Sequence, residues 1–212
     1  METKLTEQQS LSVINEMINR AQNNIKKGSG NYMIFWGYLV SATALLNIAF
    51  IYLLVYSSKS PNLSFWVWLI MIPGLIISKW MQRKIDRESI VKTHIDDIIA
   101  STWNAFMFAG YLFVFIIFVL SFSTHVYVYF YLINPVLLLF MGVSEYVTAK
   151  ACRFKPFFYG AISSWTGAVA CMCAIIFFTN GVAVQMLILA VCMVIGYVIP
   201  GIKLNKKAEE HV

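Results

Sequence analysis

Six long apolar stretches, separated by short polar segments, constrain the fold of this chain more than any other feature of its sequence. They cover residues 31–56, 65–81, 98–122, 127–149, 157–178 and 182–202. A helix needs about 20 apolar residues to cross the hydrocarbon core of a bilayer, and these stretches reach or approach that length. The strands of a membrane barrel would instead alternate apolar and polar residues over about 10 positions. The sequence therefore predicts an all-α polytopic protein with a bundle of six transmembrane helices over residues 31–202.

The basic residues fall on one side of this topology. With a cytosolic N-terminus, the cytosolic segments carry fifteen of the sixteen Lys and Arg residues, and only Lys59 lies on the other side. Cytosolic loops of membrane proteins carry an excess of Lys and Arg. The sequence therefore predicts that both termini are cytosolic and that residues 203–212 form a short cytosolic tail. The net charge of +6 comes from basic residues at membrane ends; it indicates contact with the lipid bilayer and no nucleic-acid binding.

The segment before the first span, residues 1–30, is predicted to hold a cytosolic amphipathic helix over residues 6–27. Its apolar side chains recur at helical spacing, and a glycine follows the basic last turn. Two interpretations stay open. The helix docks a partner protein, or it lies on the inner membrane face or against the protein's own cytosolic loop. The candidate partner-binding residues are Leu11, Ile14, Ile18 and Ile25.

Glu145 is the one acidic residue within a predicted span. It lies five residues before Lys150, which corresponds to about 7.5 Å of helical rise. An ionisable residue inside a membrane is a candidate functional site by default, here for a proton or a cation. The alternative is structural anchoring, in which Glu145 reaches the inner headgroup zone or pairs with Lys150 or Arg153.

The pair Asn134–Pro135 lies in the fourth stretch. Proline removes a backbone donor and can kink a helix, and a kink beside an amide would line a cavity. The alternative for Asn134 is an interhelical hydrogen bond, typically worth about 1 kcal/mol or less. Further amides expected to be buried are Asn47, Asn104 and Gln185. Pro200–Gly201 is expected to end the last helix.

Small residues thread the fifth stretch at four-residue spacing, as in Gly160 with Ser164 and Ser163 with Gly167. This pattern predicts a close helix contact, either within one chain or in a homo-oligomer. Cys171 and Cys173 do not share a helix face, so no metal site is expected there. The sequence carries no hydrolase, metalloprotease or phosphate-binding motif, so neither a cofactor nor catalysis is indicated.

The whole-chain pattern resembles a family of small bacterial six-helix integral membrane proteins. The resemblance rests on structural motifs, which are Leu11–Ile18, Phe35–Gly37, Asn134–Pro135, Lys155–Pro156 and Gly196–Gly201. It implies a location in the bacterial cytoplasmic (inner) membrane, and it implies no activity, ligand or catalytic residue.

Three hypotheses for function follow. The first is a non-enzymatic accessory or regulatory protein that presents residues 6–27 and 79–97, and with them a basic cytosolic face, to a cytosolic or membrane protein partner. The second is a small transporter or channel that uses Glu145, Asn134 and Pro135. The third is a membrane-embedded enzyme, for which no catalytic residue can be named.

Overall fold

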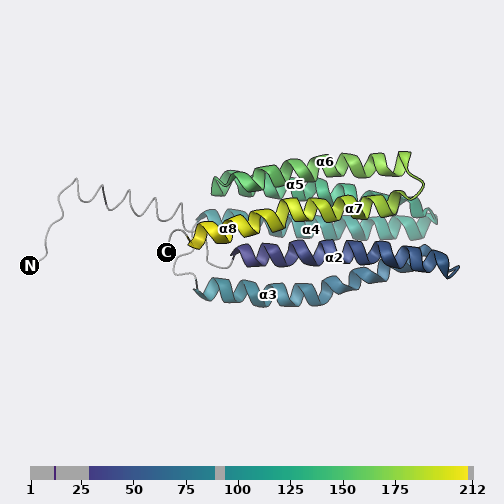
Figure 1. The fold of residues 1–212 in the computed structure, drawn as a ribbon, viewed down its shortest axis with the longest axis horizontal. Helices are drawn as coiled ribbons and strands as arrows, with labels where there is room; N and C mark the ends of the chain where they lie inside the picture. The colour runs from purple at the N-terminus through teal and green to yellow at the C-terminus, as the bar shows by residue number, and fades with distance from the viewer. Residues whose placement is uncertain (1–11, 13–28, 89–93, 210–212) are drawn as a thin grey trace, which may run out of the picture.

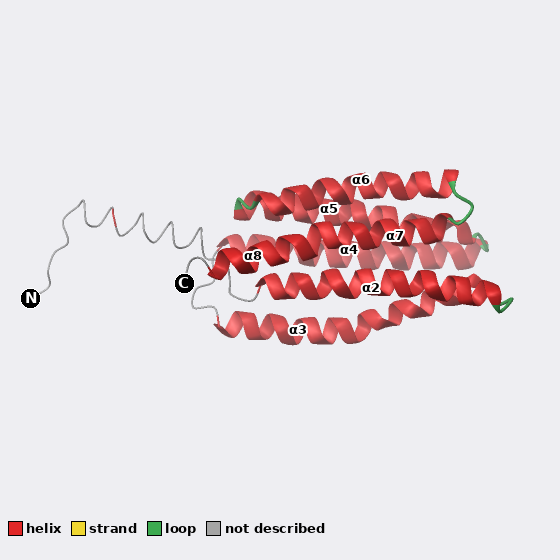
Figure 2. Cartoon of the chain, in the orientation of Figure 1, coloured by secondary structure: helices red, strands yellow, loops and turns green. Residues whose placement is uncertain are grey.

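The computed structural model describes residue 12 and residues 29–88 and 94–209. All regular elements in these ranges are helical (Figures 1 and 2). Six segments are long and apolar enough to cross a membrane, which confirms the predicted all-α fold with six spans. They are Ser29–Tyr56, Leu63–Ile85, His94–Thr124, Tyr127–Cys152, Lys155–Phe177 and Gly181–Lys207. The amphipathic helix predicted for residues 6–27 lies outside the described residues, apart from Ser12.

Three of the spans are unbroken α-helices, and the other three change their helical type along their length. The unbroken ones are α2 (Ser29–Tyr56), α4 (His94–Thr124) and α6 (Lys155–Phe177). The second span joins the 3₁₀ segment η1 (Pro61–Ile70) to α3 (Met71–Glu88), and the fourth joins the 3₁₀ segment η2 (Tyr127–Leu132) to α5 (Ile133–Cys152). The sixth consists of α7 (Gly181–Met193), the π-helical segment η3 (Val194–Val198) and α8 (Ile199–Glu209).

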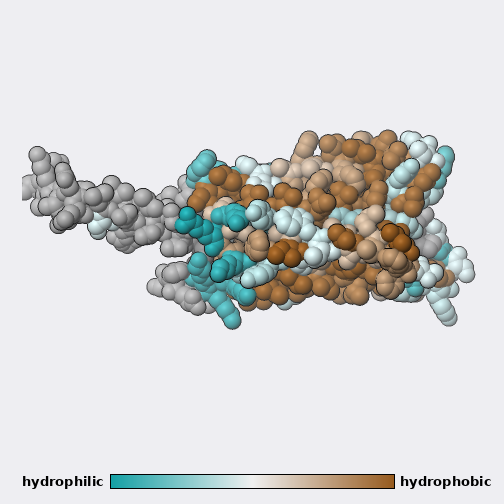
Figure 3. All heavy atoms as spheres, turned by 90° about the horizontal axis from the view of Figure 1, so that it is seen from above, coloured by the Kyte–Doolittle hydropathy of each residue, from teal (hydrophilic) through white to brown (hydrophobic). Residues whose placement is uncertain are grey.

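The spans run side by side, and consecutive spans run in opposite directions, so α2 begins and α8 ends at the same end of the bundle (Figure 1). The turn between α5 and α6 lies there too. Hydrophilic residues gather at this end, while the body of the bundle is largely apolar (Figure 3). We call it the basic end, after its exposed or half-buried cations. They include Lys79, Arg83, Lys84, Arg87, Lys150, Arg153, Lys155, Lys203, Lys206 and Lys207.

The buried core lies between α2, α5, α6 and the sixth span. Its members include Ala44, Leu138, Cys171, Leu189 and Tyr197. Half of the most apolar window of the sixth span is buried, against 17% for the second and third spans. The sixth span is therefore the central helix, and η1–α3 and α4 lie at the periphery.

Four prolines, Pro73, Pro135, Pro156 and Pro200, stand in the first turn of an α-helical segment. Pro135 is the third residue of α5 and Pro200 is the second residue of α8. A proline cannot donate to the carbonyl four residues earlier, so helical geometry has to change before it. In the sixth span the change is the π segment, where the N–H of Ile199 donates to the carbonyl of Val194, five residues back. The expectation that Pro200–Gly201 ends the helix is wrong, because α8 continues to Glu209.

Candidate functional site

Glu145 projects from α5 into the interface that α5 forms with α6 and the sixth span, and its side chain is fully buried. The hydroxyl of Ser164, on α6, donates a hydrogen bond of 2.7 Å to the Oε2 atom of Glu145. The other carboxylate oxygen, Oε1, has no hydrogen-bond partner among the described residues. The carboxyl group is therefore only half satisfied, although buried polar atoms in proteins are normally paired.

Two glycines make the space that the carboxyl group occupies. A Cβ atom added to Gly196, in η3, would lie 2.1 Å from Oε1 of Glu145, and one added to Gly160, on α6, would lie 3.3 Å from it. The same Gly160 Cβ would lie 3.0 Å from the Cα atom of Gly196, so α6 and η3 approach closely at this level. Any larger side chain at Gly196 would take the position of the carboxyl group. The site is thus built from one acid, one hydroxyl and two glycines on three spans.

The π-helical geometry of η3 coincides with this site. Gly196 is the third of its five residues, and Pro200, four residues later, has no N–H to offer the Gly196 carbonyl. Short π segments within α-helices occur frequently at functional sites. The irregular stretch of the sixth span therefore lies where the buried acid packs.

The expected anchoring of Glu145 by a basic residue is wrong. Glu145 forms no ion pair among the described residues. The Nζ atom of Lys150 lies 5.5 Å from the centre of the Tyr146 ring, and Arg153 lines a separate cavity at the basic end. The expectation that Glu145 reaches the headgroup zone is also wrong, since none of its surface is exposed.

A second polar contact joins α4 to α5 one helical turn from Glu145. The Nε1–H of Trp103 donates to the hydroxyl of Thr148 at 3.2 Å, and that hydroxyl donates to the Ser144 carbonyl at 2.7 Å. The Trp103 and Tyr197 rings also form a T-shaped contact, with 5.5 Å between the ring centres. Because Tyr197 follows Gly196, this contact supports the π segment from the α4 side.

Asn134 and Pro135 lie at the other end of α5. Asn134 is eleven residues from Glu145, about 16 Å along the helix, and Leu138 and Met141 of the apolar core lie between them. The structure therefore does not bring Asn134 and Glu145 together. The side-chain amide of Asn134 donates to the sulfur of Met186 at 3.9 Å.

Gln185 explains how the fourth span accommodates Pro135. Because Pro135 has no N–H, the carbonyl of Tyr131 lacks the donor four residues later that an α-helix would supply. The Nε2 atom of Gln185, on α7, donates to this carbonyl at 3.1 Å and to the Cys171 carbonyl at 3.0 Å. A neighbouring span thus satisfies the backbone group that the proline frees, as required in lipid.

The remaining candidates are dispersed. Asn47 is buried and donates to the Ser64 carbonyl at 2.8 Å, whereas Asn104, expected to be buried, is exposed on α4. Cys171 is buried and Cys173 is exposed, so the two thiols do not converge. The candidate partner-binding residues Leu11, Ile14, Ile18 and Ile25 lie outside the described residues.

No protein family, curated protein or solved structure matches the chain. The site's own geometry therefore carries the functional argument.

Sequence reasoning found Glu145 but missed the residues that surround it. Gly160 and Ser164 were recognisable as two small residues spaced four apart. This spacing predicted a close helix contact but not which helix would make it. That contact does form within the chain, against Glu145 and Gly196. Gly196 carried only one signal, its place four residues before Pro200.

Proposed function

We propose that this chain is a small proton-dependent transporter in which Glu145 binds and releases the proton. The observation that supports this is the fully buried carboxyl group with one hydrogen bond, one unpartnered oxygen and no ion pair among the described residues. A charged carboxylate in so apolar a setting is costly, and a bound proton removes the charge. A residue kept only for packing would need no ionisable group at this position.

Glu145 lies nearer to the basic end of α5 than to its other end. Ala149, which lines the cavity at that end, is four residues from Glu145, about 6 Å along α5. Toward the other end, Leu138 and Met141 close the helix interface. Glu145 itself is fully buried, so the proposed carrier is occluded from both ends in the described conformation, with the proton site nearer to the basic end.

We further propose that the chain resides in the bacterial cytoplasmic membrane with both termini in the cytosol. The support is the excess of Lys and Arg at one end of the six spans, which the positive-inside rule assigns to the cytosol. The basic end is then the cytosolic end.

The test is proton movement in vesicles that contain the full-length protein. A pH-sensitive dye inside the vesicles reports flux when a membrane potential is imposed. We expect the natural chain to give more flux than empty vesicles do and Glu145→Gln to give no flux above them. Asn134→Leu is the control, because its change lies about 16 Å from the acid, and it should give the same flux as the natural chain. Equal flux with Glu145→Gln would refute the role of this residue.

A spectroscopic measurement tests proton binding without any substrate. Infrared difference spectra between acid and alkaline conditions should contain a carboxylic C=O band that Glu145→Gln removes and Asn134→Leu leaves in place. Identical spectra for the natural chain and Glu145→Gln would show that Glu145 exchanges no proton.

A second proposal is the accessory role, in which the basic end binds a protein partner. It is supported by exposed cations on α3, which are Lys79, Arg83, Lys84 and Arg87. Crosslinking in intact membranes tests it. Deletion of residues 1–27 should abolish recovery of a specific partner without loss of membrane insertion, and unchanged recovery would contradict the role of that segment.

A further inference from the structure

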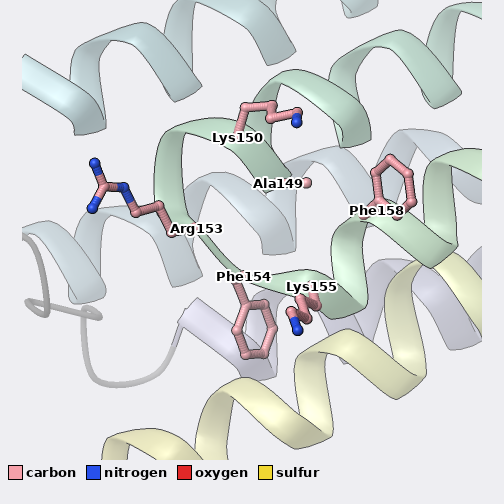
Figure 4. Close-up of a pocket in the computed structure, with 6 residues that line it drawn as sticks. All are labelled: Ala149, Lys150, Arg153, Phe154, Lys155 and Phe158. Carbon is pink, nitrogen blue, oxygen red and sulfur yellow. The ribbon is translucent and has the colours of Figure 1, made fainter.

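A cavity of about 320 Å³ lies at the turn between α5 and α6, at the basic end of the bundle. The cavity is separate from the Glu145 site, and Glu145 and Ser164 are not among its lining residues. Figure 4 shows the residues that line it. They are Ala149, Lys150, Arg153, Phe154, Lys155 and Phe158.

Three of these six residues are basic and none is acidic. Lys150, Arg153 and Lys155 are exposed, and in the view of Figure 4 they extend from the turn in different directions, on three sides of Ala149. A fourth cation lies next to them, because the Nζ atom of Lys207, on α8, is 5.8 Å from the centre of the Phe154 ring. The cavity therefore favours an anion.

The rest of the lining is apolar. Ala149 is only 7% exposed and contributes a small side chain, and Phe154 and Phe158 supply aromatic surface. Phe158 and Ile162 are four residues apart on α6, and both are substantially exposed on the outer surface of the span. An apolar surface thus leads from the cavity along the membrane-facing side of α6.

We propose that this cavity binds the headgroup of an anionic phospholipid. Basic pockets between transmembrane helices at the inner membrane surface are known binding sites for phosphate-containing headgroups. We assign the phosphate to a lipid and not to a soluble ion because the aromatic wall continues into the surface that acyl chains cover. The proposal does not depend on the transport function of Glu145.

The test measures how much phosphatidylglycerol stays bound to the full-length protein. The protein is placed in phosphatidylcholine nanodiscs with rising fractions of phosphatidylglycerol, and the bound lipids are counted by native mass spectrometry after release. We compare the natural chain with the triple variant Lys150→Gln, Arg153→Gln, Lys155→Gln. Each basic residue near anionic lipid contributes roughly fivefold in affinity, so we expect a loss on the order of 100-fold.

A matched control separates the cavity from general surface charge. The triple variant Lys79→Gln, Arg83→Gln, Lys84→Gln removes two lysines and one arginine that are exposed on α3. We expect this control to retain phosphatidylglycerol as the natural chain does. An equal loss in both triple variants would overturn the proposal in favour of non-specific attraction.

A third variant keeps every charge and fills the cavity. Ala149→Leu adds apolar volume at its buried wall, and we expect it to lower lipid retention as well. Normal retention by both Ala149→Leu and the cavity triple variant would refute the site. Inorganic phosphate distinguishes a lipid phosphate from a soluble one. The lipid assignment is wrong if millimolar phosphate displaces phosphatidylglycerol from the protein. It is also wrong if inorganic phosphate binds to the protein in pure phosphatidylcholine as well as phosphatidylglycerol does.

Discussion

Substitution of Gly196 by alanine probes the packing of the buried acid directly. The three atoms nearest to an added Cβ at this position all belong to Glu145, with Oε1 at 2.1 Å, the carboxyl carbon at 3.2 Å and Oε2 at 3.6 Å. Real Cβ atoms do not approach other atoms within 3.0 Å, so the carboxyl group or the two helices must move by about 1 Å. Overpacking of this kind typically costs about 1–3 kcal/mol. Alanine regains up to about 1 kcal/mol through its helix propensity, so we expect a net loss of about 1–2 kcal/mol.

The assay is a double-mutant cycle in which unfolding is followed by circular dichroism in detergent. Gly196→Ala is made in the natural chain and in the Glu145→Ala background, where the three clashing atoms are absent. We expect the loss to fall by at least about 1 kcal/mol in that background, because residues in contact show coupling of this size. For a chain of this length 1 kcal/mol corresponds to about 2–4 °C in Tm.

Two results decide the outcome of this cycle. If Gly196→Ala costs the same in both backgrounds, the carboxyl group does not lie against Gly196 and the described site is wrong. Gly110→Ala is the control, because a Cβ atom added to Gly110 would lie 3.1 Å from Cδ2 of Leu137, at the flexible tip of that side chain. We expect that control to be neutral or to gain up to about 1 kcal/mol through helix propensity, and to show no coupling to Glu145.

Three further predictions use the same unfolding assay. Ser164→Ala should cost about 1–3 kcal/mol, because it leaves the buried carboxyl group of Glu145 without its hydrogen-bond partner. Ser144→Ala loses only a bond within its own helix and should cost less than about 0.5 kcal/mol, so equal losses would contradict this. Gln185→Leu should cost about 1–3 kcal/mol because it leaves the Tyr131 carbonyl without its side-chain donor. The loss should be smaller in a Pro135→Ala background, where a backbone N–H returns, and an undiminished loss would contradict that account. Arg153→Gly should stabilise the protein by about 0.5–1 kcal/mol, because Arg153 has a φ of 50°, which glycine adopts without strain. The same change should weaken phosphatidylglycerol retention. A loss of stability would contradict the backbone argument.

The spans were predictable because lipid imposes a strict rule on the backbone. A chain segment in hydrocarbon must satisfy its own N–H and C=O groups, so an apolar stretch of sufficient length becomes a helix whatever its neighbours are. All six predicted stretches accordingly overlap the helices of the structure. Their ends were less predictable, since α8 continues past Gly201 to Glu209.

The surroundings of the acid were not predictable, because they depend on contacts between spans that are distant in sequence. A carboxylate near Lys150 and Arg153 suggested an ion pair by proximity along the chain. On the helix, however, Glu145 faces Ser164 and Gly196, and Lys150 lies over the Tyr146 ring. Sequence spacing gave the position of the acid along its helix but not the direction of its side chain.

The position of Gly196 shows why the acid and the irregular helix occur together. Spans in lipid gain little from hydrophobic burial against one another, so close packing through small residues and polar contacts decides how they associate. Gly160 and Gly196 allow α6 and η3 to approach each other closely. The carboxyl group of Glu145 lies at this contact, and the regular α-helical hydrogen bonds of the sixth span are interrupted there by the π segment. A packing site alone would be served by an apolar side chain and a regular helix. The half-satisfied acid beside a π segment supports the proposed proton site, since protonation of Glu145 would alter the charge held between the two helices that meet there.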